Sequence, residues 1–350
     1  MPLDRRSCVR LSLLGLGLLS LWARLKQIRF RIRHGEIFGK YLIRHPCEKH
    51  PLPSNGKILQ LSHGETFVQV DGEENQGPWL ILVHGNTGST LYLDELAKAL
   101  AAAGRRVLRY DLFGRGWSGC GGFPHTYHLF VGQLAEVMFY SGITEPVDLV
   151  GFSLGGQVSL YFAATFLHAG KLLSLTLINP AVATPKQMVV CMQLPALRSL
   201  VGWLALRVLK TTKGYSADWT HLHSSDPAMQ RASKARFDAL FPLECERFQN
   251  EPALSRSCGL SISQMPFLES SEVLERFGSA HAKVGLPVTV FWGEKDVVCP
   301  FSGAVDLARI LPDAKIVGLP EFGHSLPYEH PDACARLLLD CCKDLRNDSR

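Results

Sequence analysis

One serine occupies a position that suits a nucleophile. Ser153 lies in Gly-Phe-Ser-Leu-Gly, between an apolar run at 147–150 and an apolar stretch from 157 that is typical of a helix. A strand that turns abruptly into a helix strains the residue between them, so the turn needs neighbours without bulk two positions away on each side. Gly151 and Gly155 meet that need. We predict that the turn raises the Ser153 hydroxyl above a sheet edge, beside the amides of a helix N-terminus.

A base and an acid follow at the ends of two later apolar runs. A serine hydroxyl needs a base to take its proton, and the base works best when an acid holds its tautomer. Asp296 follows the run Val288–Trp292 in Gly-Glu-Lys-Asp, and His324 ends the stretch Glu-Phe-Gly-His after the next predicted strand. These residues predict acyl transfer, with Ser153 as nucleophile, His324 as base and Asp296 as the orienting acid.

Other assignments of the acid are weaker. Glu294 is the nearest alternative, but orienting an imidazole depends on reach and angle as well as charge, which favours Asp296. The end of the preceding strand is another place for such an acid, and Asn179 stands there. Taken singly, Asp296 could be a turn acid and His324 a hydrogen-bonded surface imidazole. Ser153, Asp296 and His324 each follow a predicted strand, in the chain order nucleophile, acid, base. This coincidence makes purely structural roles for Asp296 and His324 less favourable.

Acyl transfer also needs N–H donors aimed at the oxygen that becomes negative. The residue after the nucleophile, Leu154, supplies one backbone N–H. The loop after the apolar run at 79–84 reads His-Gly-Asn-Thr-Gly, and its glycine-rich backbone can turn a second N–H inward. We predict that this second donor is the N–H of Asn86.

The elements that must position these residues alternate between two kinds. Short, apolar, β-branched runs predict strands at Lys57–Leu61, Phe67–Val70, Trp79–His84, Arg106–Asp111, Val147–Ser153, Leu172–Asn179, Val288–Trp292 and Ala314–Gly318. Longer stretches predict helices at Leu91–Ala103, Tyr127–Ser141, Leu154–Leu167, Ser302–Leu311 and Asp332–Leu345. Several strands are apolar throughout, as parallel strands covered on both faces are. The pattern predicts an α/β fold with an open parallel sheet.

About a hundred residues between the sixth and seventh predicted strands interrupt this alternation. A loop of that length without structure is unusual in a compact domain. We therefore expect residues 181–285 to form a mostly helical cap. Residues 57–180 and 286–350 then make the core.

Residues 1–50 form a separate segment. They hold 11 Lys+Arg and 3 Asp+Glu, against 26 and 29 in the rest of the chain. The 13-residue apolar stretch Leu11–Ala23 would span about 20 Å as a helix, less than the roughly 30 Å hydrocarbon core of a bilayer. Basic residues flank it as far as Arg33, which favours contact of residues 11–33 with a membrane surface. A cleaved secretory signal or an organelle-targeting sequence is the alternative.

Charge and cysteine usage exclude other classes. The body of the chain is not basic, which argues against nucleic-acid binding. Ten cysteines in 350 residues show no Cys-x-x-Cys pair and no zinc-type spacing, so we expect reduced, packed thiols, no metal site and an intracellular protein. No obligate protein partner is evident.

Four motifs together resemble the α/β-hydrolase superfamily over residues 57–345. They are His-Gly-Asn-Thr-Gly at 84–88, Asp-Leu-Phe-Gly-Arg-Gly-Trp-Ser at 111–118, the serine turn, and Gly-Glu-Lys-Asp followed by Phe-Gly-His. The second of them is similar to that of monoacylglycerol lipase-like serine hydrolases. The resemblance implies an eight-stranded, mostly parallel sheet with helices on both faces, a cap after the sixth strand, and no cofactor. For Arg115 we expect loop bracing.

The family also shows what this sequence lacks. Dehalogenases and epoxide hydrolases of similar architecture use an aspartate where Ser153 stands. An acyltransferase-type His-x-x-x-x-Asp pattern at the catalytic histidine is broken here, because Glu329 replaces the aspartate. His221 and Asp226 have that spacing, but they lie in the predicted cap, where we interpret it as chance.

We therefore expect an enzyme, a serine esterase acting on a lipid-like ester such as a monoacylglycerol. One alternative is a carbon–carbon bond hydrolase, which uses the same three residue types. The other is a weakly catalytic or non-catalytic member that binds hydrophobic ligands or acts as a scaffold.

Overall fold

The computed structural model describes residues 52–119, 123–182, 219–250, 254, 257–261, 265 and 272–347. All of these fall within one compact unit, Pro46–Arg350. The segment predicted to contact membranes, 11–33, lies outside the described residues, as does part of the predicted cap, 183–218. Within the described ranges, every helix is too short or too polar to cross a bilayer.

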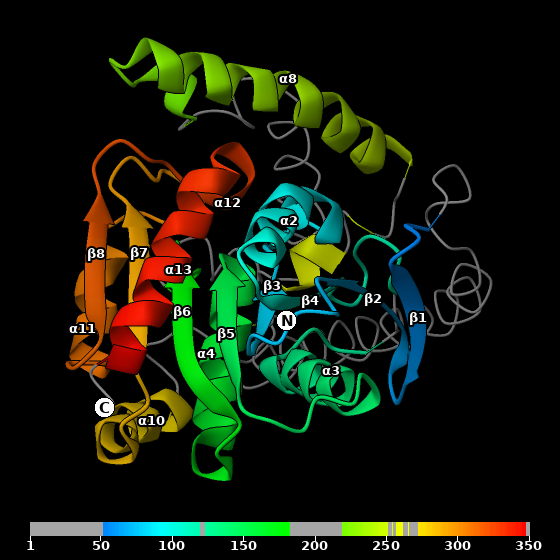
Figure 1. The fold of residues 1–350 in the computed structure, drawn as a ribbon, viewed down its shortest axis with the longest axis vertical. Helices are drawn as coiled ribbons and strands as arrows, with labels where there is room; N and C mark the ends of the chain where they lie inside the picture. Colours follow the sequence, from blue (N-terminus) through cyan, green and yellow to red (C-terminus); the bar gives the residue numbers. More distant parts are fainter. Residues whose placement is uncertain are drawn as a thin grey trace, which may run out of the picture. The chain divides into compact units, whose positions relative to one another are not determined.

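A sheet of eight strands forms the centre of this unit (Figure 1). In chain order the strands are β1 (Gly56–Leu61), β2 (Gly64–Asp71), β3 (Trp79–Val83), β4 (Arg106–Tyr110), β5 (Val147–Phe152), β6 (Leu172–Ile178), β7 (Val288–Gly293) and β8 (Lys315–Leu319). Their order across the sheet is β1-β2-β4-β3-β5-β6-β7-β8. β2 runs antiparallel to both of its neighbours, and the pairs from β4 to β8 are parallel. The predicted α/β class with a mostly parallel sheet is confirmed.

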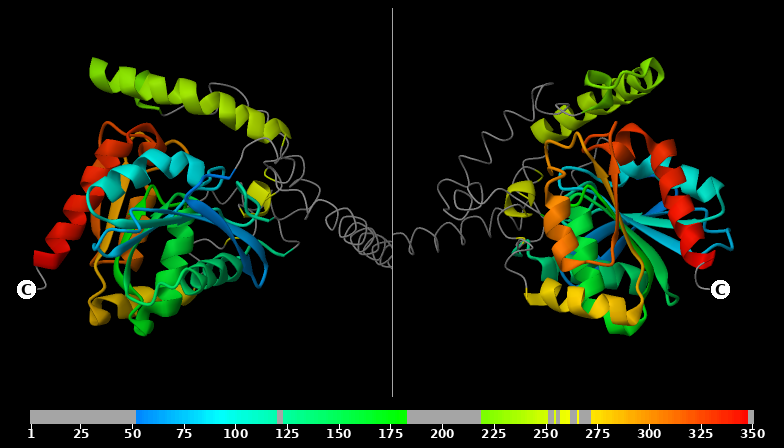
Figure 2. Two further views of the ribbon diagram at one scale, coloured as in Figure 1. Left: turned by 45° about the vertical axis from the view of Figure 1, so that its right-hand side comes forward. Right: turned by 90° about the vertical axis from the view of Figure 1, so that its left-hand side faces the viewer.

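Helices cover both faces of the sheet (Figures 1 and 2). One face carries α3 (Tyr127–Tyr140), α4 (Leu154–Phe166), α10 (Glu272–Val284) and α11 (Gly303–Ile310). The other carries α2 (Asp94–Ala102), the short α12 (Leu326–Glu329) and α13 (Pro331–Asn347). Two 3-10 turns, η1 (Thr90–Leu93) and η2 (Leu167–Ala169), join strands to these helices.

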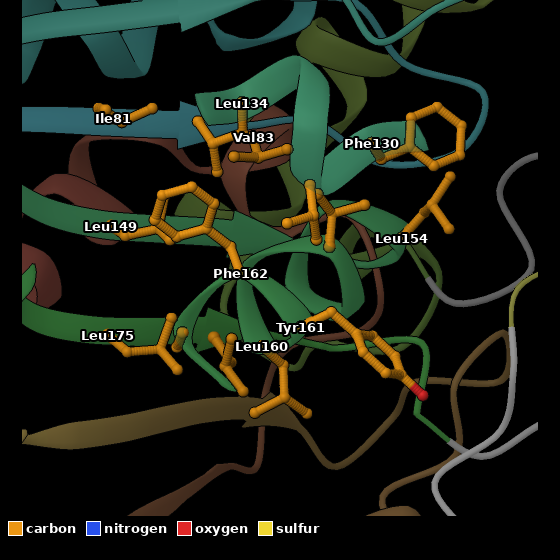
Figure 3. Packing of buried hydrophobic residues seen from close by; sticks show 14 of the residues in the cluster. Ile81, Val83, Phe130, Leu134, Leu149, Leu154, Leu160, Tyr161, Phe162 and Leu175 are labelled. Carbon is orange, nitrogen blue, oxygen red and sulfur yellow. The ribbon is translucent and has the colours of Figure 1, made fainter. Parts of the chain in front are cut away.

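The central strands are apolar throughout because both of their faces are buried. On β3, Ile81 and Val83 point into the core beneath α3 and α4 (Figure 3), whereas Leu80 and Leu82 point into the core on the α2 side. Alternate side chains of a strand point to opposite faces, so one strand contributes side chains to the core on each face of the sheet. All four side chains are at most 2% exposed. Each contributes about 1.5–3 kcal/mol by leaving water.

Part of the predicted cap belongs to the core instead. α10 lies within 181–285, but it packs against α4 and α11 through Leu274 and Phe277. A Cβ at Gly278 would lie 1.9 Å from the carbonyl oxygen of Ile310, which shows how closely α10 approaches the end of α11. The structure thus places this helix with the core layer, although it lies within the range predicted as cap. No strand is predicted between residues 181 and 285, so the sequence does not mark a core helix within this range.

The other described helices of this insertion lie at the carboxyl ends of the strands. α8 (Pro227–Asn250) extends beyond the ends of β6, β7 and β8 (Figures 1 and 2). It packs on the 3-10 turn η3 (Thr220–Leu222) and on α12. Trp219 and Phe237 join the core that lies on the α2 side of the sheet.

Glu329 ties the insertion to the core. It is 1% exposed, its Oε1 accepts the N–H of Thr220, and His330 lies 3.4 Å away. His221 faces the same region, and its Nδ1 lies 3.0 Å from Ser233 Oγ. Asp226 instead accepts the N–H of Ala228 at 2.8 Å, which caps the start of α8. The spacing of His221 and Asp226 thus reflects local structure.

We expect Glu329→Gln to weaken this junction in a pH-dependent way. Burial alone would raise the pKa of Glu329, but hydrogen bonds from His330, Ser233 and Thr220 outweigh burial and hold it below the ordinary 4.5. The ionised carboxylate therefore stabilises the fold above about pH 4.5, and that stabilisation is lost as the pH falls through the lower folded pKa. At pH 7 the variant should lose about 1–3 kcal/mol in free energy of unfolding.

Urea unfolding of the wild type and Glu329→Gln at pH 7 and at progressively lower pH measures this effect. The exposed Glu95→Gln is the control and should change little. Equal stability of Glu329→Gln and the wild type at pH 7 would contradict the prediction.

Candidate active site

The structure brings together the three side chains that the sequence singles out. His324 Nε2 lies 3.1 Å from Ser153 Oγ, and His324 Nδ1 lies 2.7 Å from Asp296 Oδ2. The carboxylate accepts the Nδ1–H, so Nε2 carries the lone pair that accepts the serine proton. Ser153 is 6% and Asp296 5% exposed, which strengthens both interactions.

Ser153 sits on a strained turn between β5 and α4. Its φ of 54° and ψ of −118° place it where non-glycine residues rarely lie. The turn passes close to other backbone. A Cβ at Gly151 would lie 2.3 Å from the Gly155 oxygen, and one at Gly155 would lie 2.2 Å from the Val83 oxygen. Both glycines are thus needed for space, as the sequence predicts.

The acid lies in the turn that follows β7. Asp296 Oδ1 accepts the N–H of Val298 at 2.8 Å and that of Cys299 at 2.6 Å, which leaves Oδ2 facing His324. These two bonds fix the direction of the carboxylate. Glu294, the alternative acid, is exposed and lies against Gly318. The geometry favours Asp296.

Asn179 holds the two loops that carry the acid and the base. It ends β6 in a left-handed conformation, with φ of 44°, which asparagine tolerates better than most residues. Its Nδ2 donates to the carbonyl oxygens of Gly323 at 3.0 Å and His324 at 2.7 Å. Its Oδ1 accepts the N–H of Gly293 at 2.7 Å. One side chain thus connects the β7 and β8 loops.

The glycine-rich loop at 84–88 passes beside the serine. A Cβ at Gly85 would lie 3.1 Å from the Cβ of Ser153. The N–H of Asn86 makes no hydrogen bond to the residues that the structure describes. Leu154 is the first residue of α4, so its N–H has no partner within the helix. Both predicted oxyanion donors therefore belong to segments that flank the serine.

The profile of the alpha/beta hydrolase fold family matches residues 78–331, more than half of the chain. This protein belongs to the α/β hydrolase fold family. The matched range includes every residue of the site described above.

Curated relatives of this hydrolase-fold protein differ in the bonds that their names imply. Proline iminopeptidase of Clostridioides difficile is 32% identical over 30% of this chain and 37% of its own length. Monoacylglycerol lipase ABHD6 of Homo sapiens is 26% identical over 58% of this chain and 56% of its own length. The chain thus spans about half or less of these two proteins. A 2-hydroxy-6-oxo-6-phenylhexa-2,4-dienoate hydrolase of Burkholderia cepacia is 26% identical over 77% of this chain and 88% of its own length.

Solved structures agree on the fold. The enol-lactonase from Burkholderia xenovorans LB400 matches with a TM-score of 0.62, at 20% identity over 82% of this chain and all of that one. At this identity the likeness shows the fold alone.

Arg115 connects the glycine-rich loop to the insertion. Its Nε donates to the Asn86 oxygen at 3.0 Å, and its NH2 group donates to Ser261 Oγ at 2.7 Å and to the Asn86 side chain. The Cys258 thiol also donates to the Asn86 oxygen, at 3.2 Å. Arg115 is 1% exposed. It braces the loop, as the sequence predicts. Its partners Ser257 and Ser261 lie 142 and 146 positions further along the chain, which the sequence does not indicate.

We expect Arg115→Lys to lower kcat more than it raises KM. A lysine carries its donors on one nitrogen and lacks the planar fork with which Arg115 reaches the Asn86 carbonyl oxygen, the Asn86 side chain and Ser261, so the N–H of Asn86 would be held less firmly. Loss of an oxyanion donor lowers kcat by about 10²- to 10³-fold, and we expect misplacement to lower it by about 10- to 100-fold. Steady-state kinetics of Arg115→Lys beside the exposed Arg309→Lys measure this. A change confined to KM would argue against the role in positioning.

The sequence does not indicate Tyr328 as a site residue, and it indicates the position of Asn179 but not its role in anchoring two loops. The Tyr328 ring packs against Tyr92 and Phe152, and its hydroxyl lies 3.4 Å from the Gly85 nitrogen. A Cβ at Gly88 would lie 2.4 Å from that hydroxyl, so Tyr328 shapes the glycine-rich loop. Its helix, α12, has only four residues, too few for a periodic pattern.

Proposed function

We propose that this protein is a serine hydrolase that cleaves carboxylic esters with an apolar acyl chain. The observation that carries the proposal is the hydrogen-bonded series Ser153–His324–Asp296, at 3.1 and 2.7 Å, with the serine on a strained strand-to-helix turn. The lipase relative supports an ester of the monoacylglycerol type.

In the first half of the reaction, Ser153 Oγ attacks the ester carbonyl while His324 Nε2 takes its proton. Asp296 holds the Nδ1–H and stabilises the imidazolium. The N–H groups of Leu154 and Asn86 donate to the oxyanion. When the tetrahedral intermediate collapses, His324 returns the proton to the leaving alcohol, and the acyl group stays on Ser153.

In the second half, water replaces the alcohol. His324 takes a proton from the water as its oxygen attacks the acyl carbonyl, and the second tetrahedral intermediate forms on the same oxyanion donors. Its collapse breaks the bond to Ser153 Oγ, which recovers its proton from His324. The products are one alcohol and one carboxylic acid.

A fluorophosphonate probe tests the nucleophile, and a substrate panel tests the bond. We expect labelling of the folded protein that disappears in Ser153→Ala. We expect faster hydrolysis of monoacylglycerols than of lysophospholipids or short aryl esters. Folded protein that does not label would support the alternative of a hydrophobic-ligand-binding or scaffold member.

Carbon–carbon bond hydrolysis is the second candidate. The relative from Burkholderia cepacia, which aligns with 77% of this chain at 26% identity, favours it. Assays with a vinylogous diketone beside the esters separate the two. Labelled protein that cleaves only the diketone would replace the ester proposal with this one.

Membrane association through residues 11–33 is a further part of the proposal and rests on the sequence. Co-sedimentation with anionic vesicles of the full chain, and of a chain that lacks residues 1–50, tests it. Equal binding by both would reject it.

A further inference from the structure

A cysteine that the proposed reaction does not use faces the same histidine and aspartate. Cys299 lies three residues after Asp296 in the turn that follows β7. Its sulfur, a carboxylate oxygen of Asp296 and a ring nitrogen of His324 all lie within 4.8 Å of one another. Cys299 is 6% exposed and is not part of a disulfide.

The turn itself holds this sulfur in place. The Cys299 N–H donates to Asp296 Oδ1 at 2.6 Å, and its carbonyl oxygen accepts the Trp292 Nε1–H at 2.8 Å. Trp292 is 1% exposed in the core, so the anchor is rigid. The backbone on both sides of the thiol is therefore fixed relative to the carboxylate.

We propose that Asp296, Cys299 and His324 form an inhibitory site for a thiophilic divalent cation of the Zn²⁺ class. This inference rests on the proposed function, because inhibition presupposes a reaction. One thiolate, one imidazole and one carboxylate are ligands that zinc accepts, at about 2.3, 2.0–2.1 and 2.0–2.2 Å. The fourth position is left for water. The ion is an inhibitor here and takes no part in the reaction.

The present spacing needs only small adjustments. In a tetrahedral site the ligand atoms lie about 3.2–3.7 Å apart, as follows from these bond lengths. The 2.7 Å contact between His324 Nδ1 and Asp296 Oδ2 must then widen by about half an ångström. The sulfur, now within 4.8 Å of the other two atoms, approaches them by up to about 1–1.5 Å. Oδ1 of Asp296 keeps its two backbone bonds and continues to orient the carboxylate.

Binding removes the base. The ion bonds to the lone pair at His324 Nδ1, the proton that sat there moves through solvent to Nε2, and Cys299 releases its thiol proton to solvent. One proton leaves the protein for each ion bound. Nε2 then bears a hydrogen and cannot accept the proton of Ser153. A chelator that removes the ion returns both protons to their starting places and restores activity.

The test uses the full chain as wild type, Cys299→Ser, Cys299→Ala and a control, Cys341→Ser. Cys341 is a good control because its thiol donates to Thr289 Oγ1 at 3.1 Å, a bond that a serine hydroxyl can also make. ZnCl₂ is titrated against hydrolysis of a short aryl ester, and each rate is normalised to that variant's own metal-free rate. EDTA is added at the end.

We expect zinc to inhibit the wild type and Cys341→Ser equally and reversibly. Mutation of residues that merely support a zinc ligand lowers affinity about 10- to 100-fold, so loss of the thiolate in either Cys299 variant should weaken inhibition at least tenfold. Equal inhibition of wild type and both Cys299 variants would overturn the site.

Cobalt binding gives a second measurement that needs no activity. Co²⁺ added to Ser153→Ala should give the near-ultraviolet thiolate-to-metal band and the visible bands of a tetrahedral site, and both should vanish in the double variant with Cys299→Ser. If these bands appear but the wild type hydrolyses no ester, the cation site stands and the proposed function is rejected. Absence of any band that depends on Cys299 would reject the site alone.

Discussion

Replacing His324 with alanine lowers kcat by about 10³-fold or more, and the protein remains folded. The reason is geometric. His324 Nε2 is the group within 3.1 Å of Ser153 Oγ, and no water chain is required between them. Asp296→Asn should lower kcat by a similar factor, because an amide at that position favours the wrong tautomer of the imidazole. Rates with a short aryl ester and circular dichroism of each variant make the measurement.

Two matched variants test whether the loss is specific. His168 is an exposed histidine in η2, and Glu294 is an exposed carboxylate two residues from Asp296. His168→Ala and Glu294→Gln should retain close to wild-type kcat. If Asp296→Asn were as active as Glu294→Gln, the carboxylate would have no part in catalysis and the assignment of the site would fail.

The second large effect concerns folding. Gly155→Ala should lower the free energy of unfolding by about 3 kcal/mol or more, or prevent folding, because the added Cβ would lie 2.2 Å from the Val83 oxygen and 2.6 Å from the His84 oxygen. Both contacts are with backbone of β3 and its loop, which cannot move aside without breaking the sheet. Yield of soluble protein and urea unfolding measure this.

Gly132→Ala is the matched control, and its effect should have the opposite sign. A Cβ at Gly132, within α3, would have no atom within 4 Å. Alanine favours a helix over glycine by about 0.5–1 kcal/mol, so this variant should be slightly more stable than the wild type. Equal stability of the Gly155 and Gly132 variants would show that the serine turn has more room than the structure gives it.

Local rules made much of the sheet and of the site predictable. Apolar runs on parallel strands and the glycines around Ser153 are short-range signals, and they placed the proposed nucleophile. Asp296 and His324 followed because functional side chains of such sheets gather where the strands end. Each of these inferences needs only a few neighbouring residues and the chain order.

What the sequence did not predict depends on contacts between distant segments. The bonds from Arg115 to Ser261 and from Glu329 to Thr220 join residues more than 100 positions apart, and no local pattern marks them. α10 has the apolar spacing of an amphipathic helix, which fits a cap and a core layer equally well. In the sequence, Cys299 is not distinguished from the other cysteines. Its proximity to His324 depends on the path of the backbone through two loops, which no local pattern indicates.

The asparagine at the end of β6 also limits how this chain can evolve. Some hydrolases of this architecture carry their acid at that strand end, and a single base change can turn an asparagine codon into an aspartate codon. Here the exchange would set a carboxylate against the carbonyl oxygens of Gly323 and His324, which now receive the Nδ2 hydrogens of Asn179. Moving the acid from the end of β7 to the end of β6 therefore requires that other hydrogen bonds first hold the loop that carries His324.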